Sequence, residues 1–459
     1  MFILMVVIFV LGYTAIALEH PIKVDKAASA LLIGSLTWVA YIFGAADIFH
    51  SGVSTAWNDF VLNNPSLNNH EGMVDFIVHH QIIEHLGEIS EILFFLLGAM
   101  TIVEIIDQHQ GFKIITDKIT TTKKVKLLWI LSFLTFFMSA ALDNLTTTIV
   151  MIALLRKLID DKETRWFYAS MVVLAANAGG AWSPIGDVTT IMLWIGGQVT
   201  ALNIIMMVII PSLVTMIIPV IFLSFTMKGD VKRPVLSAAD KKDFTTGFER
   251  KLILFMGVGA LLFVPVFKTI THLPPYMGML FGLGVIWVTT ELMHKHKNGE
   301  DKRRLTVIGI LRKVDVPTVL FFLGILSAVA SLQSAGHLGL LATWLDEVTN
   351  KNIYVINTAI GILSSIVDNV PLVAGAMGMY DIQAVGHFAV DGVFWELLAF
   401  TAGTGGSILI IGSAAGVAAM GMEKIDFIWY MKRISLLALL GYFAGIATYW
   451  LQATILHSH

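Results

Sequence analysis

Runs of about 17–25 apolar residues follow one another along this chain, separated by short polar segments. A run of this length crosses the hydrocarbon core of a bilayer as an α-helix. Of the 459 residues, 56% are hydrophobic and 14% are charged, whereas about 25% are charged in a soluble domain. Mean hydropathy is +0.78. The sequence therefore predicts an all-α polytopic membrane protein, whose surroundings are the lipid bilayer.

The apolar runs differ in how they are interrupted. Eight read as simple spans, at about residues 1–18, 27–45, 88–106, 203–226, 250–268, 276–293, 317–333 and 427–453. Two longer stretches are interrupted by Asp-Asn pairs and are predicted to be re-entrant hairpins, at 127–158 and 353–380. Two others contain helix-breaking text and are predicted to be broken transmembrane helices, at 166–197 and 392–421. A membrane tolerates broken backbone only where protein or a hydrated cavity satisfies its polar groups.

The same text returns after about half the chain. Asp143-Asn144 and Asp368-Asn369 lie 225 positions apart, and a Phe-Leu-Gly segment recurs at nearly that interval. We therefore expect a first repeat over 1–226, a cytoplasmic linker over 227–249 and a second repeat over 250–459. Each half holds five crossings plus one hairpin, and because five is odd the second half has inverted topology. Inverted repeats place a transport site at their interface, near the bilayer midplane.

The positive charges indicate the orientation. With both termini on the outer side of the membrane, six loops become cytoplasmic and hold 28 of the 30 Lys and Arg residues. The positive-inside rule supports this arrangement. No Lys or Arg precedes Lys23, so we expect residues 1–18 to remain as a helix and not to be a cleaved signal peptide. The basic residues lie in short loops without interleaved aromatics, which argues against nucleic acid as a partner.

The Asp-Asn pairs are candidates for ion binding. Asp and Asn also cap helices, but Asn or Ser would cap without burying charge, and a carboxylate at the bilayer centre costs roughly 2.5–3.5 kcal/mol. Oxygen ligands suit a hard monovalent cation, and carboxylates let H⁺ compete for it. The predicted ion site comprises the polar residues at the hairpin tips and helix breaks: Asp143, Asn144, Thr146, Thr147, Asn177, Ser183, Asp187, Thr189, Thr190, Ser364, Asp368, Asn369, Thr404 and Ser407. The second broken helix has no acid near its break, so the two half-sites are unequal.

A second polar group precedes the third span: His79, His80, Glu84, His85, Glu88 and Glu91. Adjacent imidazoles and carboxylates there suit a solvated face, or a pH-sensing or access role, because imidazole titrates near neutral pH. We expect no transition metal. The chain has no cysteine, and it shows no nucleophile–base pair, zinc motif or phosphate loop. We therefore expect neither an enzyme nor a cofactor, only transported ions.

Several segments resemble the NhaD-type Na⁺/H⁺ antiporters of the ion transporter superfamily. They are HLGEISEILFFLLGAMTIVEIIDQHQGF (85–112), ALDNLTTTIVMIALLRKL (141–158), NAGGAWSPIGDVTTIMLW (177–194), SSIVDNVPLVAGAMGM (364–379) and TAGTGGSILIIGSAAGVAAMG (401–421). The resemblance covers essentially the whole chain. It implies exchange of external H⁺ for internal Na⁺, and often Li⁺, across a bacterial inner membrane. It also implies a homodimer working as an elevator, and it adds Ser139 to the matching polar positions.

One departure from the superfamily bears on the substrate. Its dicarboxylate carriers have Ser-Asn-Thr at each hairpin tip, whereas here the tips read Asp-Asn-Leu-Thr and Asp-Asn-Val-Pro. Three fixed carboxylates would repel a dicarboxylate, which favours cation exchange. The alternative is an anion or metalloid carrier on the same fold, for arsenite or a Na⁺-coupled organic acid, because helix N-termini at hairpin tips favour anions.

Overall fold

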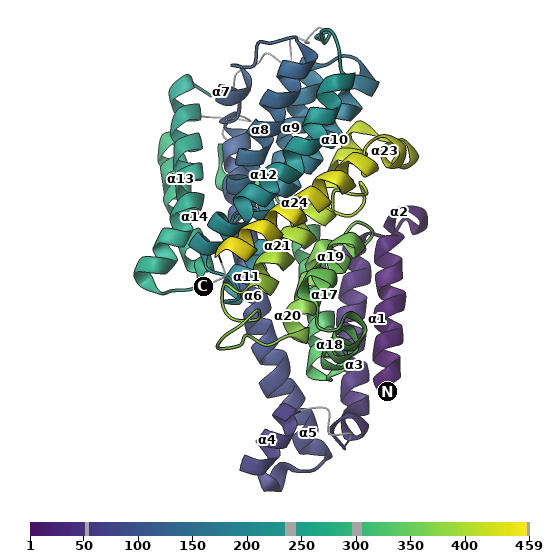
Figure 1. Cartoon of the computed structure of the whole chain (residues 1–459). Helices are drawn as coiled ribbons and strands as arrows, with labels where there is room; N and C mark the ends of the chain where they lie inside the picture. Colours follow the sequence, from purple (N-terminus) through teal and green to yellow (C-terminus); the bar gives the residue numbers. More distant parts are fainter. Residues whose placement is uncertain (51–54, 235–244, 296–304, 457–459) are drawn as a thin grey trace. The chain divides into compact units, whose positions relative to one another are not determined.

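The computed structural model describes residues 1–50, 55–234, 245–295 and 305–456 (Figure 1). Within these residues the secondary structure is helical apart from two isolated β-bridges. Eight of the described helical segments are long and apolar enough to cross a bilayer. The prediction of a polytopic α-helical membrane protein is confirmed. Part of the expected linker over 227–249 lies outside the described residues.

The chain forms two compact units, and each takes segments from both expected halves. Unit 1 comprises Met1–Phe94, Asp315–Ile356 and Val370–Ile382. Unit 2 comprises Phe95–Val314, Asn357–Asn369 and Gln383–His459. The division into compact units therefore does not follow chain order. The division into two repeats, over 1–226 and 250–459, remains a prediction.

Unit 1 is built around three helices, α1 (Phe2–Ala17), α3 (Lys26–His50) and α17 (Val316–Ser334), with α3 packed against the other two. Polar side chains join α3 to α17 inside this apolar packing. Trp38 Nε1 donates to Ser327 Oγ at 3.1 Å, and the Tyr41 hydroxyl donates to the Ser334 carbonyl at 3.1 Å. The unit also contains α2 (Glu19–Ile22), α4 (Thr55–Asn63), η1 (Pro65–Leu67), α5 (His70–Phe76), the π-helical turn η2 (Ile77–Ile82), the start of α6 (Ile83–Gln108) and α18 (His337–Thr349).

The first predicted hairpin and broken helix lie in unit 2. The hairpin consists of α8 (Lys124–Leu142) and α9 (Asn144–Leu158), which meet at Asp143. The broken helix consists of α10 (Lys162–Ala181) and α11 (Val188–Ile195), with an irregular segment between them. Helix α10 packs against both α8 and α9. The break follows from Gly-Gly-Ala-Trp-Ser-Pro-Ile-Gly, because Gly and Pro weaken a helix interior.

The second predicted hairpin and broken helix show the same two-part form. Helices α19 (Ile353–Leu363) and α20 (Asn369–Met379) flank Asp368, and α21 (Val393–Gly405) and α22 (Ala414–Glu423) flank the glycine-rich break. Asn369 starts α20 two positions before Pro371, and proline is favoured in the first turn of a helix. The interruptions predicted for these four stretches are confirmed.

Some predicted boundaries were wrong. Helix α8 has 19 residues, so by length it could cross a bilayer alone, whereas we expected residues 127–158 to form a re-entrant hairpin. No Gly or Pro interrupts its sequence before Asp143, which explains the longer helix. The span expected at 427–453 is two helices, α23 (Phe427–Arg433) and α24 (Ser435–Leu456). Helix α18 was not predicted, because it is amphipathic and its polar residues interrupt the apolar run.

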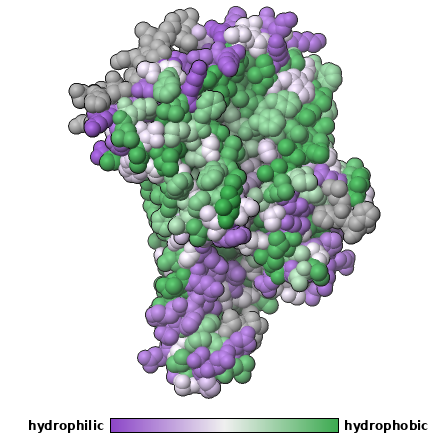
Figure 2. Space-filling model, turned by 90° about the vertical axis from the view of Figure 1, so that its left-hand side faces the viewer, coloured by the Kyte–Doolittle hydropathy of each residue, from purple (hydrophilic) through white to green (hydrophobic). Residues whose placement is uncertain are grey.

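The remaining helices of unit 2 include two that expose many large apolar side chains. Helices α13 (Gly247–Thr271) and α14 (Pro275–Met293) pack against each other, and they expose large apolar side chains such as Phe255, Phe281 and Val288. Figure 2 shows hydrophobic residues over much of the face on the side of these helices. Such a surface suits contact with lipid acyl chains. The unit also contains the end of α6, α7 (Lys113–Thr116), α12 (Ala201–Thr226) and α16 (Val307–Leu311).

Candidate ion-binding site

All the residues predicted for ion binding belong to unit 2. They come from the junction of α8 with α9, the break between α10 and α11, the segment before α20 and the break between α21 and α22. At each of these places a helix begins, so backbone N–H groups have no partner within their own helix. The sequence did not predict which of these residues contact one another. The structure brings a core of them into direct hydrogen-bond contact.

Asp143 occupies an unusual backbone conformation at the hairpin tip. Its φ of 84° and ψ of 160° fall in a region that is almost confined to glycine. Its carboxylate caps α9: Oδ1 accepts from the Thr146 amide at 2.7 Å, and Oδ2 accepts from the Thr146 hydroxyl at 2.8 Å. Strained backbone of this kind costs of order 1–3 kcal/mol and clusters at functional sites. Asp368, its counterpart, has no positive φ.

Asn144 connects the hairpin tip to the first broken helix. Its side-chain amide donates to Asn177 Oδ1 at 3.0 Å and to Asp187 Oδ2 at 2.9 Å. Asp187 Oδ1 in turn accepts from the backbone amide and the hydroxyl of Thr189, both at 3.1 Å, and so caps α11. Asn144, Asn177 and Asp187 are all buried. Predicted residues from two different elements thus share one network.

Asn177 also reaches the second broken helix. Its amide donates to Ser407 Oγ at 2.8 Å and to Ser413 Oγ at 2.9 Å. Ser413 caps α22 by accepting from the Gly416 amide. Ser413 was not among the predicted ion-site residues, although it lies 226 positions after Asp187, near the repeat interval. That spacing was the signal that could have found it.

Two carboxylates act electrostatically on a third. The charges of Asp368 and Asp143 both act on Asp187, whose side chain is buried. Among the described residues, neither Asp143 nor Asp187 forms a salt bridge with Lys or Arg. A buried carboxylate needs either a compensating positive charge or a proton. These groups can therefore hold a cation or be protonated.

Other predicted residues contribute to packing around this network. Four hydroxyls donate to backbone carbonyls: Ser183 to Ala140, Thr190 to Ala181, Ser364 to Ala402 and Thr404 to Phe400. Ser139 donates likewise to Ala176 at 2.6 Å. The buried Thr147 hydroxyl has no hydrogen-bond partner among the described residues and could offer its oxygen to a cation. Asn369 is buried at the start of α20.

The predicted histidine and glutamate group lies in unit 1 and is mostly exposed. His79 Nδ1 lies 3.1 Å from an Asp75 carboxylate oxygen, one helical turn away. His85 contacts Glu88 at 3.2 Å through Nδ1 and the Ser334 hydroxyl at 3.0 Å through Nε2. Within the described part of the chain, no three His, Asp or Glu side chains converge as metal ligands. The pH-sensing or access role stays a prediction.

The sequence reading missed two buried glutamates in unit 2. Glu396 of α21 accepts hydrogen bonds from the Asn203 amide and, at 2.5 Å, from the Tyr449 hydroxyl. Glu423, at the end of α22, accepts from Arg156 and Arg165. Both acids stand within or next to apolar segments. The sequence therefore does not tell whether their side chains are buried or exposed at a helix end. Only contacts between distant segments reveal it.

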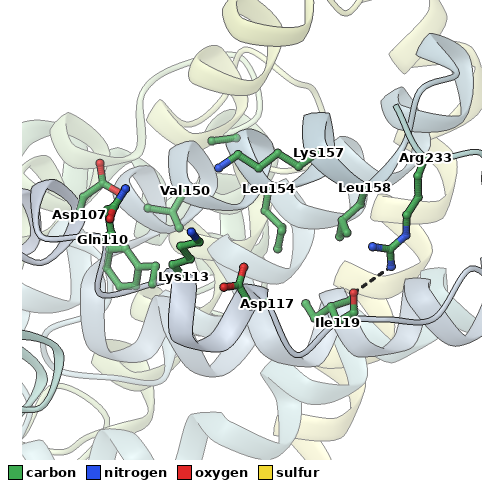
Figure 3. A pocket seen from close by; sticks show the side chains of 12 residues that line it. Asp107, Gln110, Lys113, Asp117, Ile119, Val150, Leu154, Lys157, Leu158 and Arg233 are labelled. Atoms are coloured by element: carbon green, nitrogen blue, oxygen red, sulfur yellow. Dashed lines mark hydrogen bonds between the residues drawn. The ribbon is translucent and has the colours of Figure 1, made fainter. Parts of the chain in front are cut away.

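A cavity of about 330 Å³ lies in unit 2 (Figure 3). Val150, Leu154 and Leu158 of α9 form part of its wall, and the Arg233 guanidinium donates to the Ile119 carbonyl at one end. The remaining lining residues are Asp107, Gln110, Phe112, Lys113, Asp117, Ala153 and Lys157. Acids and bases are mixed in this lining. The cavity contains none of the predicted ion-site residues.

Comparison with known proteins gives consistent matches along the chain. A family model described as "Citrate transporter" matches residues 3–405. Sodium/proton antiporter 2 of Arabidopsis thaliana is 44% identical, over 97% of this chain and 98% of its own length. Sodium/proton antiporter 1 of the same plant is 46% identical, over 97% of this chain and 71% of its own length. The Na⁺/H⁺ antiporter NhaD of Alkalimonas amylolytica is 30% identical, over 98% of this chain and 91% of its own length.

Proposed function

Because the chain belongs to the NhaD-type sodium/proton antiporters, within the family described as citrate transporters, we propose that it exchanges Na⁺ for H⁺ across a membrane. It is a transporter and not an enzyme. The names of the relatives support sodium/proton antiport. The direction we propose is export of cytoplasmic Na⁺ in exchange for external H⁺, with Li⁺ as a second substrate.

The observation that carries the proposal is the group of three aspartates in unit 2. Asp143, Asp187 and Asp368 stand at three helix starts, and the first and third act electrostatically on the second. Among the described residues, Asp143 and Asp187 lack a basic partner, so either Na⁺ or H⁺ must offset their charge. The two ions then exclude each other, and each crossing carries one of them. This competition is the physical basis of exchange.

The remaining predicted residues supply neutral oxygens. Asn144, Asn177 and Ser407 hold the network together, and Thr147 has a free hydroxyl oxygen among the described residues. Carboxylate, amide, hydroxyl and backbone oxygens are the ligands that hard cations take. We propose that Na⁺ binds among these groups as the substrate. No resident cofactor is needed for this exchange.

The proposed alternating access rests on two inverted repeats. Three pairs of equivalent contacts recur with a spacing of 225–226 positions. The first pair is the hydrogen bonds from Ser139 to Ala176 and from Ser364 to Ala402, and the second is the helix caps of Asp187 and Ser413. The third is the close approach of Gly179 to the Phe136 carbonyl and of Gly405 to the Gly361 carbonyl. Equivalent contacts in both halves support a duplicated architecture. We propose that hairpins and broken helices move as an elevator within a homodimer. The proposed location is a bacterial inner membrane, with both termini outside.

Replacement of the aspartates tests the proposal directly. Asp143→Asn, Asp187→Asn and Asp368→Asn should each abolish Na⁺-dependent changes of ΔpH in everted membrane vesicles. Asp426→Asn is a matched control, because Asp426 caps α23 and Asn caps a helix equally well. Full activity in all three site variants, at wild-type protein levels, would overturn the assignment.

A second candidate is an organic-anion or metalloid carrier. The family description "Citrate transporter" favours it, as do helix N-termini near the network, which attract anions. The buried carboxylates oppose it through like-charge repulsion. Proteoliposomes given Na⁺, Li⁺, citrate or arsenite in turn separate the two: an H⁺ flux driven by Na⁺ alone supports antiport. Citrate uptake that needs Na⁺ would support the alternative.

A further inference from the structure

Helices α9 and α22 are joined at the site through Asn177. Asn144, the first residue of α9, donates to Asn177 Oδ1, and Asn177 donates to Ser413, which caps α22. Asn177 itself belongs to α10, which packs against both helices. One amide side chain therefore fixes the starts of α9 and α22 relative to each other.

The far ends of the same helices are joined through Glu423. Its Oε1 accepts from Arg156 Nε of α9 at 2.7 Å, and its Oε2 accepts from Arg165 Nε of α10 at 2.6 Å. The Glu423 side chain is 1% exposed, while Arg156 is 48% exposed. Arg156 also donates to the Met422 carbonyl, and Trp166 Nε1 donates to the Glu423 carbonyl at 3.0 Å. A buried carboxylate with two charged donors is a strong, directional contact.

The hydrogen bonds of Asn177 and those of Glu423 lie at opposite ends of the group formed by α9, α10 and α22. Asn144 and Arg156 are about 18 Å apart along α9, and Ser413 and Glu423 are about 15 Å apart along α22, at 1.5 Å per residue. A helix is stiff along its axis, so a shift at one end appears at the other. With both ends fixed, neither α9 nor α22 can slide along α10 without breaking hydrogen bonds of the site.

We propose that Glu423 is a positioning residue for the ion site: by holding Arg156 and Arg165 it sets the axial register of α9 and α22, and so the geometry of the Asn144–Asn177–Ser413 contacts. The inference rests on the proposed function, because its readout is the affinity for Na⁺. It differs from a direct charge effect, because the carboxylate works through geometry. A merely structural role would lower the amount of folded protein without changing that affinity.

The experiment measures the apparent KM for Na⁺ in proteoliposomes, normalised to folded protein. Glu423→Gln should raise KM about tenfold, the change expected from losing one hydrogen bond of the site. Glu423→Asp keeps the charge but shortens the side chain, and it should raise KM similarly. Arg156→Lys keeps the charge at a half-exposed position that tolerates change, and it should raise KM as well. Asp426→Asn, three residues from Glu423, should leave KM unchanged.

Combination with Ser413→Ala tests the connection between the two ends. Suppose that Glu423 acts through the hydrogen bond between Asn177 and Ser413. The double variant Ser413→Ala/Glu423→Gln should then raise KM no more than the single variant with the larger effect. Multiplied effects, or a wild-type KM in Glu423→Asp, would overturn the inference. If wild-type protein showed no Na⁺-dependent H⁺ flux, the proposed function would fail at that step. If wild type exchanged Na⁺ and Glu423→Gln changed only the maximal rate, the positioning role alone would fail.

Discussion

Replacement of Gly179 by alanine tests how the first hairpin packs on the first broken helix. A Cβ added to Gly179 of α10 would lie 2.2 Å from the Phe136 carbonyl oxygen of α8, and 2.9 Å from both Phe136 C and Cα. Non-bonded heavy atoms prefer roughly 3.5 Å, so the two helices would have to separate by about 1 Å. All three contacted atoms belong to backbone, so no side-chain rotation can relieve the overlap.

The loss of stability expected for Gly179→Ala follows from this separation of the helices. Overpacking of a well-packed core costs about 1–3 kcal/mol. The Ser139 hydroxyl donates to the Ala176 carbonyl at 2.6 Å across the same helix pair. A further 1 Å would stretch this hydrogen bond beyond useful length, at a cost of about 0.5–1.5 kcal/mol. We expect Gly179→Ala to lower the free energy of unfolding by about 2–4 kcal/mol.

Gly405 gives an independent repetition of the test. A Cβ there would lie 2.0 Å from the Gly361 carbonyl oxygen, so Gly405→Ala should destabilise to a similar extent. Gly259 of α13 is the control, because nothing lies within 4 Å of its added Cβ. Gly259→Ala should be neutral or stabilising by up to about 1 kcal/mol, since alanine favours helix over glycine.

The assay is reversible unfolding of purified protein in mixed micelles, followed by circular dichroism as the denaturing detergent increases. Sodium-dependent H⁺ flux in proteoliposomes is measured in parallel. If the free energies of unfolding of Gly179→Ala and Gly405→Ala lay within about 0.5 kcal/mol of that of Gly259→Ala, the inferred close approach of these backbones would be refuted. The packing that positions the aspartates would then need revision.

Three further predictions concern single polar side chains. Asn177→Ala loses three hydrogen bonds and should lower the free energy of unfolding by about 2–4 kcal/mol; an unchanged free energy of unfolding would contradict it. The Thr164 hydroxyl and amide lower the pKa of Asp161, which caps α10, so its carboxylate stabilises the fold above its ordinary pKa near 4 and loses this effect as pH falls through the lowered value. Melting temperatures of wild type and Asp161→Ala should therefore differ at pH 7 and converge in acid, and a constant difference would refute this. Glu396→Leu removes the carboxylate that accepts from the Asn203 amide and the Tyr449 hydroxyl, whereas Glu396→Gln keeps an acceptor oxygen there. Glu396→Leu should therefore unfold more easily than Glu396→Gln, and equal denaturation midpoints would count against that account.

The sequence alone determined the membrane class and four places where an apolar run is interrupted. Apolar length requires spanning helices, and an Asp-Asn pair or a Gly-rich segment inside an apolar run interrupts the helix at that point. The aspartates could also be singled out locally, because a charge in such a run has a cost that needs a reason. Family membership followed from the same residues and is supported by the relatives.

The tertiary structure decided which of these residues meet. Asn177 and Ser413 are 236 positions apart, yet a hydrogen bond joins them, and no local pattern encodes such a pairing. Helix lengths at α8 and α23 also escaped prediction, because hydropathy does not report where tertiary contacts end a helix. The Glu423 contacts with two arginines are of the same kind: composition places charges at loop ends, but only packing in three dimensions chooses their partners.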